Sequence, residues 1–186
     1  MASDSGALLS RRVYAATLLD VPSMVCKSMA DSTELSPLAQ ALGRVPTGLY
    51  LLTTRHGDDP IGLVASFVMQ VGFEPPTVMV ALGAGRDQLS AIRASGRFAL
   101  SVLDEQSSSL MGAFFSKQGS PFETLAHEQS PGGMPVFTEA LAWLDCRISG
   151  EHDAGDHVAV FGVVETARLL HEGDPSVHFR KNGLSY

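Results

Sequence analysis

Short apolar runs, rich in β-branched and aromatic residues, recur along this chain and are separated by glycine, proline and charged residues. Runs of this length and composition predict β-strands. The turn cluster His56-Gly57-Asp58-Asp59-Pro60 joins the first two runs into a hairpin, and Asp153-Ala154-Gly155-Asp156 predicts a tight turn between two later ones. The expected strands are 48–54, 61–71, 77–82, 98–103, 141–149, 157–169 and 177–180.

Helical signals interrupt the strands at a few places. Ser36 is expected to cap a first short helix that has Pro37 at its first position and ends at Gly43. Asp87 is expected to cap a second helix, which Gly96 closes. The expected helices are 37–42, 87–95 and 106–116, and the segment 117–135 is expected to be a long loop.

About seven strands with short helices between them indicate a mainly β fold of the barrel type rather than alternating β and α units. The chain of 186 residues has the size of one domain with a tail. Residues 1–32 are expected to be a poorly packed tail, because they lack a sustained period and precede the first helix cap. The domain would then span 33–186. Met24 and Met29 are alternative starts, which leaves open whether residues 1–32 belong to the native protein.

Composition excludes several classes of function. The formal net charge of -7 argues against nucleic acid as the main partner, since phosphates require a cationic face. No apolar run approaches the length of a membrane span. Cys26 and Cys146 lie far apart and form no Cys-x-x-Cys, so neither a metal site nor a redox pair is expected. Together these features predict a cytoplasmic protein of ordinary globular composition.

The first candidate for chemistry is the glycine turn Gly83-Ala84-Gly85-Arg86, which lies between a strand and a helix N-terminus. The free amides and the dipole of such an N-terminus favour an anion, and Arg86 adds a charge that binds phosphate in a forked geometry. A dinucleotide fingerprint is an alternative, with Asp104 near the position of the ribose acid. However, Gln88 replaces its third glycine. An ordinary turn remains a further alternative.

The second candidate is Gly155-Asp156-His157, at the entry to a strand. His157 is either a solvated turn residue or a ring whose tautomer Asp156 fixes towards a substrate. The run Ser107-Ser108-Ser109 has no Gly-x-Ser-x-Gly elbow, so helix capping is expected there rather than nucleophilic catalysis. Trp143 is expected in the core.

Four further motifs follow one another along the chain. They are Gly62-Leu63-Val64-Ala65-Ser66-Phe67 with Phe73-Glu74-Pro75-Pro76, then 95–103, then Gly155-Asp156-His157 with Gly162, then His178-Phe179-Arg180-Lys181-Asn182-Gly183. In this order and spacing they resemble the flavin-reductase-like family over about residues 38–186. The chain is also similar to the reductase-like module of flavodiiron proteins.

The resemblance implies an FMN-binding split β-barrel with short inserted helices that works as a homodimer, with the flavin near the subunit interface. FMN is expected rather than FAD, because the phosphate segment is short and no adenine pocket is evident. No metal is expected, because the histidines and cysteines lack metal-site spacing. The resemblance also implies roles for particular residues. The isoalloxazine ring would meet the backbone of Val64, Ala65, Ser66 and Phe67; the phosphate and ribityl chain would meet Arg86, Asp87 and Gln88; nicotinamide would lie near His157; and Phe179 and Arg180 would lie beside the flavin.

The sequence departs from the family pattern at two of these places. The common Thr-Ala-Asn-Ser is here Val64-Ala65-Ser66-Phe67, which removes polar side chains beside the ring. A hydroxyl-rich phosphate segment is replaced by Gly85-Arg86-Asp87-Gln88. Asp87 is unfavourable beside a phosphate unless it points away.

The implied activity is hydride transfer from NADH or NADPH to flavin N5, with the reduced flavin serving a redox partner or a flavin-dependent monooxygenase. In such an enzyme the cofactor supplies the difficult chemistry and the protein supplies position and electrostatics. Two alternatives remain: an FMN electron carrier without nicotinamide turnover, and a split barrel that binds haem. A visible spectrum separates haem from flavin, and the kinetics of NAD(P)H oxidation separate an enzyme from a carrier.

Overall fold

The computed structural model describes residues 35–116 and 119–181. The expected tail, residues 1–32, lies outside the described residues, so its structure stays a prediction. The described helices are too short or too polar to cross a membrane.

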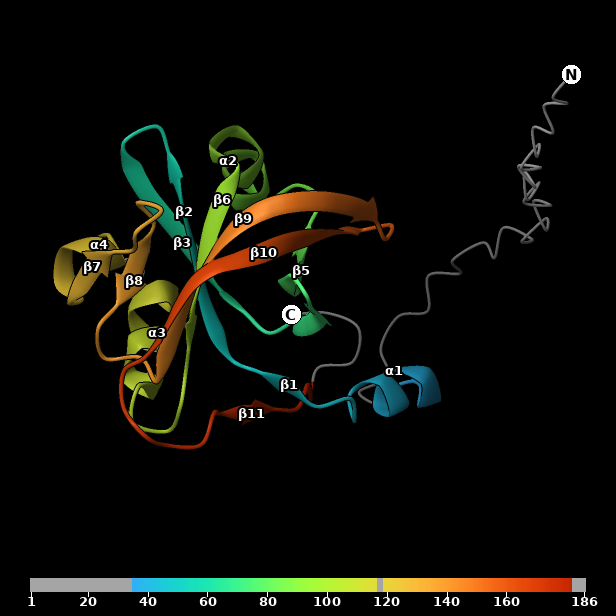
Figure 1. Ribbon diagram of the computed structural model, residues 1–186. Helices are drawn as coiled ribbons and strands as arrows, with labels where there is room; N and C mark the ends of the chain where they lie inside the picture. The colour runs from blue at the N-terminus through green and yellow to red at the C-terminus, as the bar shows by residue number, and fades with distance from the viewer. Residues whose placement is uncertain (1–34, 117–118, 182–186) are drawn as a thin grey trace, which may run out of the picture. The chain divides into compact units, whose positions relative to one another are not determined.

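Seven antiparallel strands form the central sheet, in the order β3-β2-β6-β9-β10-β5-β4. The strands cross and twist around one another (Figure 1). This confirms the prediction of a mainly β fold. The strands are β2 (Tyr50–His56), β3 (Asp59–Ala65), β4 (Val68–Phe73), β5 (Pro76–Gly83), β6 (Arg97–Val102), β9 (Ala142–Asp153) and β10 (His157–Leu169).

One predicted strand is in fact two. The run 61–71 was expected to be continuous, but the chain turns at Ser66 and Phe67, between β3 and β4. The Phe67 carbonyl accepts a hydrogen bond from the Ala81 N–H of β5 (2.9 Å), which fixes the turn to the neighbouring strand. The break carries no glycine or proline, and therefore the local signals for a turn are missing.

Two small strand pairs flank the main sheet. β1 (Thr47–Gly48) pairs with β11 (Val177–His178), and β7 (His127–Gln129) pairs with β8 (Pro135–Phe137). The last expected strand, 177–180, is therefore shorter than predicted. The expected loop 117–135 is also only partly a loop, because it holds α4 (Pro121–Thr124) and β7.

The helices are short, and their caps follow the sequence in part. In α1 (Pro37–Leu42) the Ser36 hydroxyl accepts a hydrogen bond from the Ala39 N–H (3.2 Å), as predicted. α2 (Asp87–Ser95) ends at Gly96, which adopts a left-handed conformation with φ 69°. The N-cap of α2 is Arg86 rather than the predicted Asp87, and no side chain caps it.

The third helix, α3 (Ser108–Phe115), begins at Ser107 without the expected side-chain capping bond. The Ser107 hydroxyl instead donates to the Asp104 carboxylate (2.6 Å). Asp104 is therefore a structural residue here, and the dinucleotide interpretation of Asp104 loses its support.

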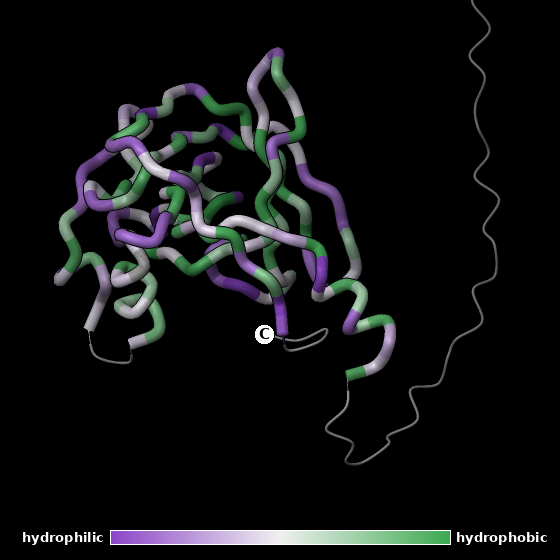
Figure 2. The backbone as a smooth tube through the Cα atoms, turned by 90° about the horizontal axis from the view of Figure 1, so that it is seen from below, coloured by the Kyte–Doolittle hydropathy of each residue, from purple (hydrophilic) through white to green (hydrophobic). Residues whose placement is uncertain are grey.

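Apolar side chains fill both faces of the sheet. Figure 2 shows hydrophobic and hydrophilic stretches following one another along the backbone. The inner face packs Leu52, Val80, Phe98 and Val160 against Ile92 of α2. The outer face packs against α3, the loop between α4 and β8, and β8 itself, through buried residues that include Leu51, Leu103, Leu110, Phe137 and Trp143.

Cys146 and Trp143 of β9 are both core residues, and Trp143 was predicted to be one. The Cys146 thiol is free and buried, and burial raises its pKa to about 12, which makes it unreactive at neutral pH. The described residues contain no group of side chains with metal-binding geometry.

Candidate functional site

Four segments that are far apart in sequence meet at one end of β5 and β10. The Phe67 ring lies edge-on to the His157 ring, with centroids 5.7 Å apart. The guanidinium carbon of Arg180 lies 4.7 Å from the centre of the same Phe67 ring. His157 pairs with Gly83 in the β10–β5 ladder, which brings the start of α2 to the same place. The structure therefore brings all four predicted site segments together around Phe67 and His157.

The β3–β4 turn is held rigidly at this place. Besides the bond to Ala81, the Val68 N–H donates to the Ser66 carbonyl (3.0 Å). Ser66 is buried and Phe67 is half-buried. A half-buried ring on a fixed turn offers a preformed apolar surface for a planar ligand.

Val64 and Ala65 precede that turn and contribute their side chains to the core. Val64 packs with Leu51 in the core on the outer face of the sheet, whereas Ala65 is buried in the core on the inner face. Successive strand residues point to opposite faces, which explains the division. Only the backbone of this pair is left to contact a ligand, as the resemblance to the family implied.

His157 is held by its neighbour Asp156. The His157 Nδ1 atom lies 3.0 Å from Asp156 Oδ1, and the His157 side chain is 24% exposed. The hydrogen bond from His157 lowers the pKa of Asp156, so this carboxylate stays ionised and can fix the proton of the ring on Nδ1. The geometry resembles an oriented ring more than a freely solvated turn residue.

The same turn is tied to the segment that precedes α2. The Ala84 N–H donates to the Asp156 carbonyl (3.0 Å). Ala84, Gly85, Arg86 and Asp87 are all exposed, and a Cβ added to Gly85 would meet no atom within 4 Å. The backbone here is therefore open to an approaching ligand.

The N-terminus of α2 provides the elements of an anion site. Asp87 and Gln88 are its first two residues, whose N–H groups have no acceptor within the helix, and the helix dipole is positive there. Arg86 places a cation beside them. Asp87 opposes an anion electrostatically, but its exposed side chain is free to point into solvent.

Gln88 has a structural bond that the sequence does not reveal. Its Nε2 donates to the Gly62 carbonyl of β3 (3.1 Å). The side chain therefore ties α2 to β3. Any contribution of Gln88 to a ribityl chain would come from the backbone or from the side-chain oxygen.

The C-terminal segment carries two of the predicted site residues, Phe179 and Arg180, and their side chains differ in exposure. Phe179 is 49% exposed, while Arg180 is half-buried against Phe67. The carbonyl oxygen of Arg180 lies so close to Gly43 that a Cβ there would sit 2.6 Å from it. Only glycine at the end of α1 allows this approach.

Sequence reasoning missed Thr47, which lies next to this segment. Thr47 pairs with His178 in the β1–β11 ladder. Its Oγ1 is buried and has no hydrogen-bond partner within the described part of the chain. A buried hydroxyl without a partner is uncommon in proteins and suits a ligand atom. The available signal was its position between Pro46 and Gly48 at a strand start.

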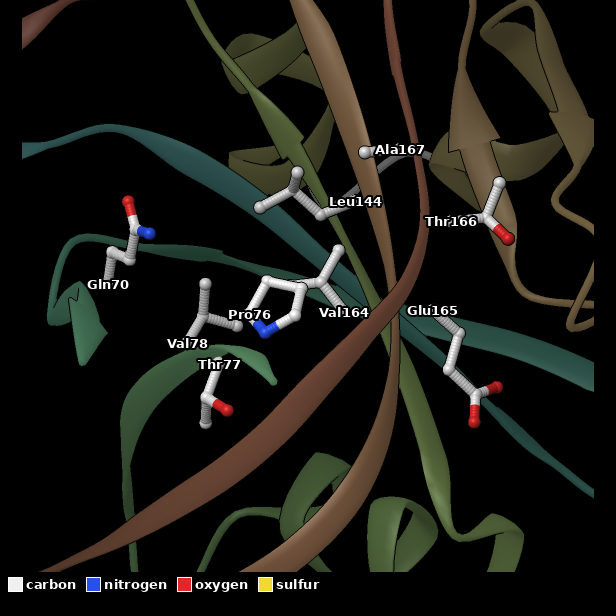
Figure 3. Close-up of a pocket in the computed structure, with 9 residues that line it drawn as sticks. All are labelled: Gln70, Pro76, Thr77, Val78, Leu144, Val164, Glu165, Thr166 and Ala167. Atoms are coloured by element: carbon white, nitrogen blue, oxygen red, sulfur yellow. The ribbon is translucent and has the colours of Figure 1, made fainter. Parts of the chain in front are cut away.

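A separate hollow of about 380 Å³ lies at the other end of β5 (Figure 3). Thr77, which lines it, pairs with Val163, six positions along β10 from His157. Its lining is mainly apolar. The lining residues are Gln70, Pro76, Thr77, Val78, Leu144, Val164, Glu165, Thr166 and Ala167. None of the predicted site residues lines this hollow.

Comparison with known proteins identifies relatives over most of the chain. The model of the flavin reductase like domain matches residues 42–183. The reductase subunit HsaB of a flavin-dependent monooxygenase from Mycobacterium tuberculosis is 34% identical over 137 residues, which cover 73% of each protein. Diflavin flavoprotein A 1 from Synechocystis is 33% identical over 156 residues, which cover 81% of this chain. The matched region is only 27% of that longer relative.

Solved structures agree on the fold. Nitrilotriacetate monooxygenase component B from Mycobacterium thermoresistibile superposes with a TM-score of 0.70 and 29% identity, covering 76% of this chain and 80% of the other. Flavin reductase PheA2 superposes with a TM-score of 0.68 and 27% identity, covering 78% and 95% of the two chains. The split β-barrel predicted from the resemblance is confirmed.

Proposed function

Because the chain belongs to the flavin reductase like family, we propose that it binds FMN and reduces it with NADH or NADPH. Flavin reduction is the activity of this family of oxidoreductases. The observation that carries the finer proposal is the meeting of Phe67, His157 and Arg180 beside the N-terminus of α2.

The residues present fit a flavin mononucleotide. The open backbone at Gly85, the cation of Arg86 and the N-terminus of α2 suit its phosphate. The backbone of 64–67 and the Phe67 ring suit the isoalloxazine, and the unpartnered Thr47 hydroxyl supplies a polar contact nearby. FMN is proposed over FAD because the anion-binding segment is short and no adenine pocket is evident in the sequence.

When bound, the flavin supplies an acceptor for hydride from the nicotinamide. The chain's own residues position the reactants. Asp156 holds the His157 ring through Nδ1, which leaves Nε2 to contact the nicotinamide. Phe67 and Arg180 would form a wall beside the bound ring system, and the β3–β4 turn would hold that wall in place. No side chain is required to act as a strong acid or base.

The reduced flavin is proposed to serve a partner protein. HsaB is named as the reductase subunit of a flavin-dependent monooxygenase, and by analogy the partner here is a monooxygenase that uses reduced flavin. The relation to the longer diflavin flavoproteins favours a second candidate, an FMN electron carrier whose electrons come from another protein. In that case NAD(P)H would not reduce the bound flavin.

We also propose that the chain is a homodimer. Met69, Val71 and Phe73 of the edge strand β4 are 60%, 45% and 89% exposed. A β-bulge between Gln70 and Gly72 interrupts the pairing of β4 with β5 here. Exposed apolar residues gathered on an edge strand mark an interaction surface. Light scattering of the wild type and of Val71→Glu tests this. A monomeric wild type would contradict the proposal.

The domain is proposed to span 33–186. Deletion of residues 1–32 is expected to leave folding and flavin binding intact, because Ser36 already caps the first helix. Circular dichroism and FMN titration of the truncated chain check this. Loss of soluble protein would show that the tail is part of the fold.

The proposed function is tested by NAD(P)H oxidation with the purified full-length chain, with and without added FMN. Oxidation that requires both the protein and FMN supports a reductase. A rate no greater than that of NAD(P)H and free FMN alone would contradict it. Parallel assays with NADH and NADPH establish the preferred donor, and calorimetry with FMN and FAD tests the flavin preference.

A further inference from the structure

The segment that follows β10 crosses the sheet end before it reaches the site. We call residues 170–181 the C-terminal strap. The Leu170 N–H donates to the Leu141 carbonyl (2.9 Å), and the Ser176 N–H donates to the Leu103 carbonyl (2.8 Å). The strap then forms β11 against β1 and ends with Arg180 over Phe67. Its course therefore determines where the Arg180 guanidinium lies.

A buried carboxylate holds the first part of the strap. Asp104 follows β6, and its side chain is 4% exposed. Its Oδ1 accepts hydrogen bonds from the Ser107 N–H (2.8 Å) and hydroxyl (2.6 Å). Its Oδ2 lies 2.8 Å from His171 Nε2. All the described partners of this carboxylate are donors, which suits a charged form held inside the protein.

The surroundings of Asp104 keep it ionised. The bonds from Ser107 and His171 lower its pKa to about 2. Glu105 and Asp174 are the charged groups that line the neighbouring hollow with it, and both are exposed. A buried carboxylate that loses one donor is costly, so His171 is bound firmly in place at neutral pH.

We propose that His171 is a positioning residue for the flavin site: its bond to Asp104 clasps the C-terminal strap and thereby sets Arg180 over Phe67. The inference rests on the proposed flavin binding and goes beyond it, since His171 bonds to Asp104 rather than to a predicted site residue. It also gives a role to a histidine whose side chain is 33% exposed and which lies against a buried acid.

The test is FMN affinity in full-length variants, measured by fluorescence titration. His171→Leu removes the donor, and His171→Gln retains an N–H for Asp104. We expect His171→Leu to weaken FMN binding about threefold or more, as couplings within one network do, and His171→Gln to restore most of it. In an Arg180→Ala background His171→Leu should cause no further loss, because the residue acts through Arg180.

Glu172→Gln is the matched control, since Glu172 is an exposed neighbour on the same strap. It should bind FMN like the wild type. A purely structural role predicts that His171→Leu lowers the melting temperature while the dissociation constant stays unchanged, or that its effect adds fully to Arg180→Ala. Either result would contradict the proposal that the His171–Asp104 bond positions Arg180.

FMN affinity does not depend on the proposed reaction, so the two proposals are tested separately. A wild type that binds FMN but does not oxidise NAD(P)H contradicts the reductase, and the affinities of the variants still test the role of His171. A wild type that binds no FMN overturns both.

Discussion

The guanidinium carbon of Arg180 lies 4.7 Å from the centre of the Phe67 ring. The two residues come from a turn and a C-terminal strap with more than half of the chain between them. A cation over an aromatic face contributes about 0.5–2 kcal/mol, depending on desolvation. This contact connects the strap to the β3–β4 turn, and it forms one wall of the proposed flavin site.

Arg180→Ala should therefore weaken FMN binding by about twofold or more, because the proposed site loses the side chain that forms one of its walls. Lys181 is the adjacent exposed cation on the strap, and Lys181→Ala is the matched control. Calorimetric titration with FMN measures both. Equal losses of FMN affinity in the two variants would mean that Arg180 acts only through its positive charge and not through a specific contact.

Arg86→Ala should weaken FMN binding by about tenfold or more, as expected for the loss of a charged hydrogen bond of roughly 1.5–3 kcal/mol. The loss should shrink at high salt, because exposed charges are screened. Arg93, in the last turn of the same helix, forms an ion pair with Glu151 (2.8 Å), so Arg93→Ala is the control. If Arg86→Ala leaves the dissociation constant unchanged, the phosphate binds elsewhere.

His157→Ala should leave FMN affinity nearly unchanged and slow the reduction of bound flavin by NAD(P)H. A misplacement of the donor by about one ångström can slow the reaction roughly a hundredfold. His152 lies across the same turn and is exposed, so His152→Ala should behave like the wild type. Equally fast reduction in both variants would show that His157 has no part in hydride transfer, while the proposed reductase activity would stand.

The depressed pKa of Asp104 predicts a specific acid sensitivity. The ordinary pKa of 3.8 falls to about 2 in the folded protein. At a pH between these two values the native state therefore binds fewer protons than the unfolded state. The stabilisation is complete above about pH 4 and is lost as the pH falls towards 2. Asp104→Asn should flatten this part of the curve of unfolding free energy against pH.

Urea unfolding at a series of pH values measures the effect of Asp104. Asp174→Asn, which removes an exposed carboxyl near Asp104, is the control and should retain the wild-type slope. The explanation fails if Asp104→Asn keeps the same slope between pH 4 and 2.

Local sequence signals predicted the elements well where short-range chemistry determines them. Ser36 caps α1, Gly96 ends α2 in a left-handed conformation, and residues 154–156 form the turn between β9 and β10. In each case the responsible interaction lies within a few residues along the chain. The turn at Ser66 and Phe67 was missed because its cause is a hydrogen bond to Ala81 on another strand.

The site was predictable in parts but not in its assembly. The glycine turn, Arg86 and the Asp156–His157 pair are visible as motifs, and the resemblance to the family added Phe67 and Arg180. Their meeting depends on strand register, which no local pattern specifies. Gln88 illustrates the limit, since its bond to the Gly62 carbonyl requires knowledge of the packing of α2 on β3.

The central claim, that this chain passes hydride from a nicotinamide to its flavin, is tested most directly by anaerobic stopped-flow mixing. The full-length protein loaded with FMN is mixed with NADH and, separately, with NADPH, and the flavin absorbance is followed. We predict bleaching of the oxidised flavin with at least one donor, at a rate that rises to saturation with donor concentration. Flavin that dithionite reduces but neither nucleotide reduces would contradict the claim and identify the protein as an electron carrier.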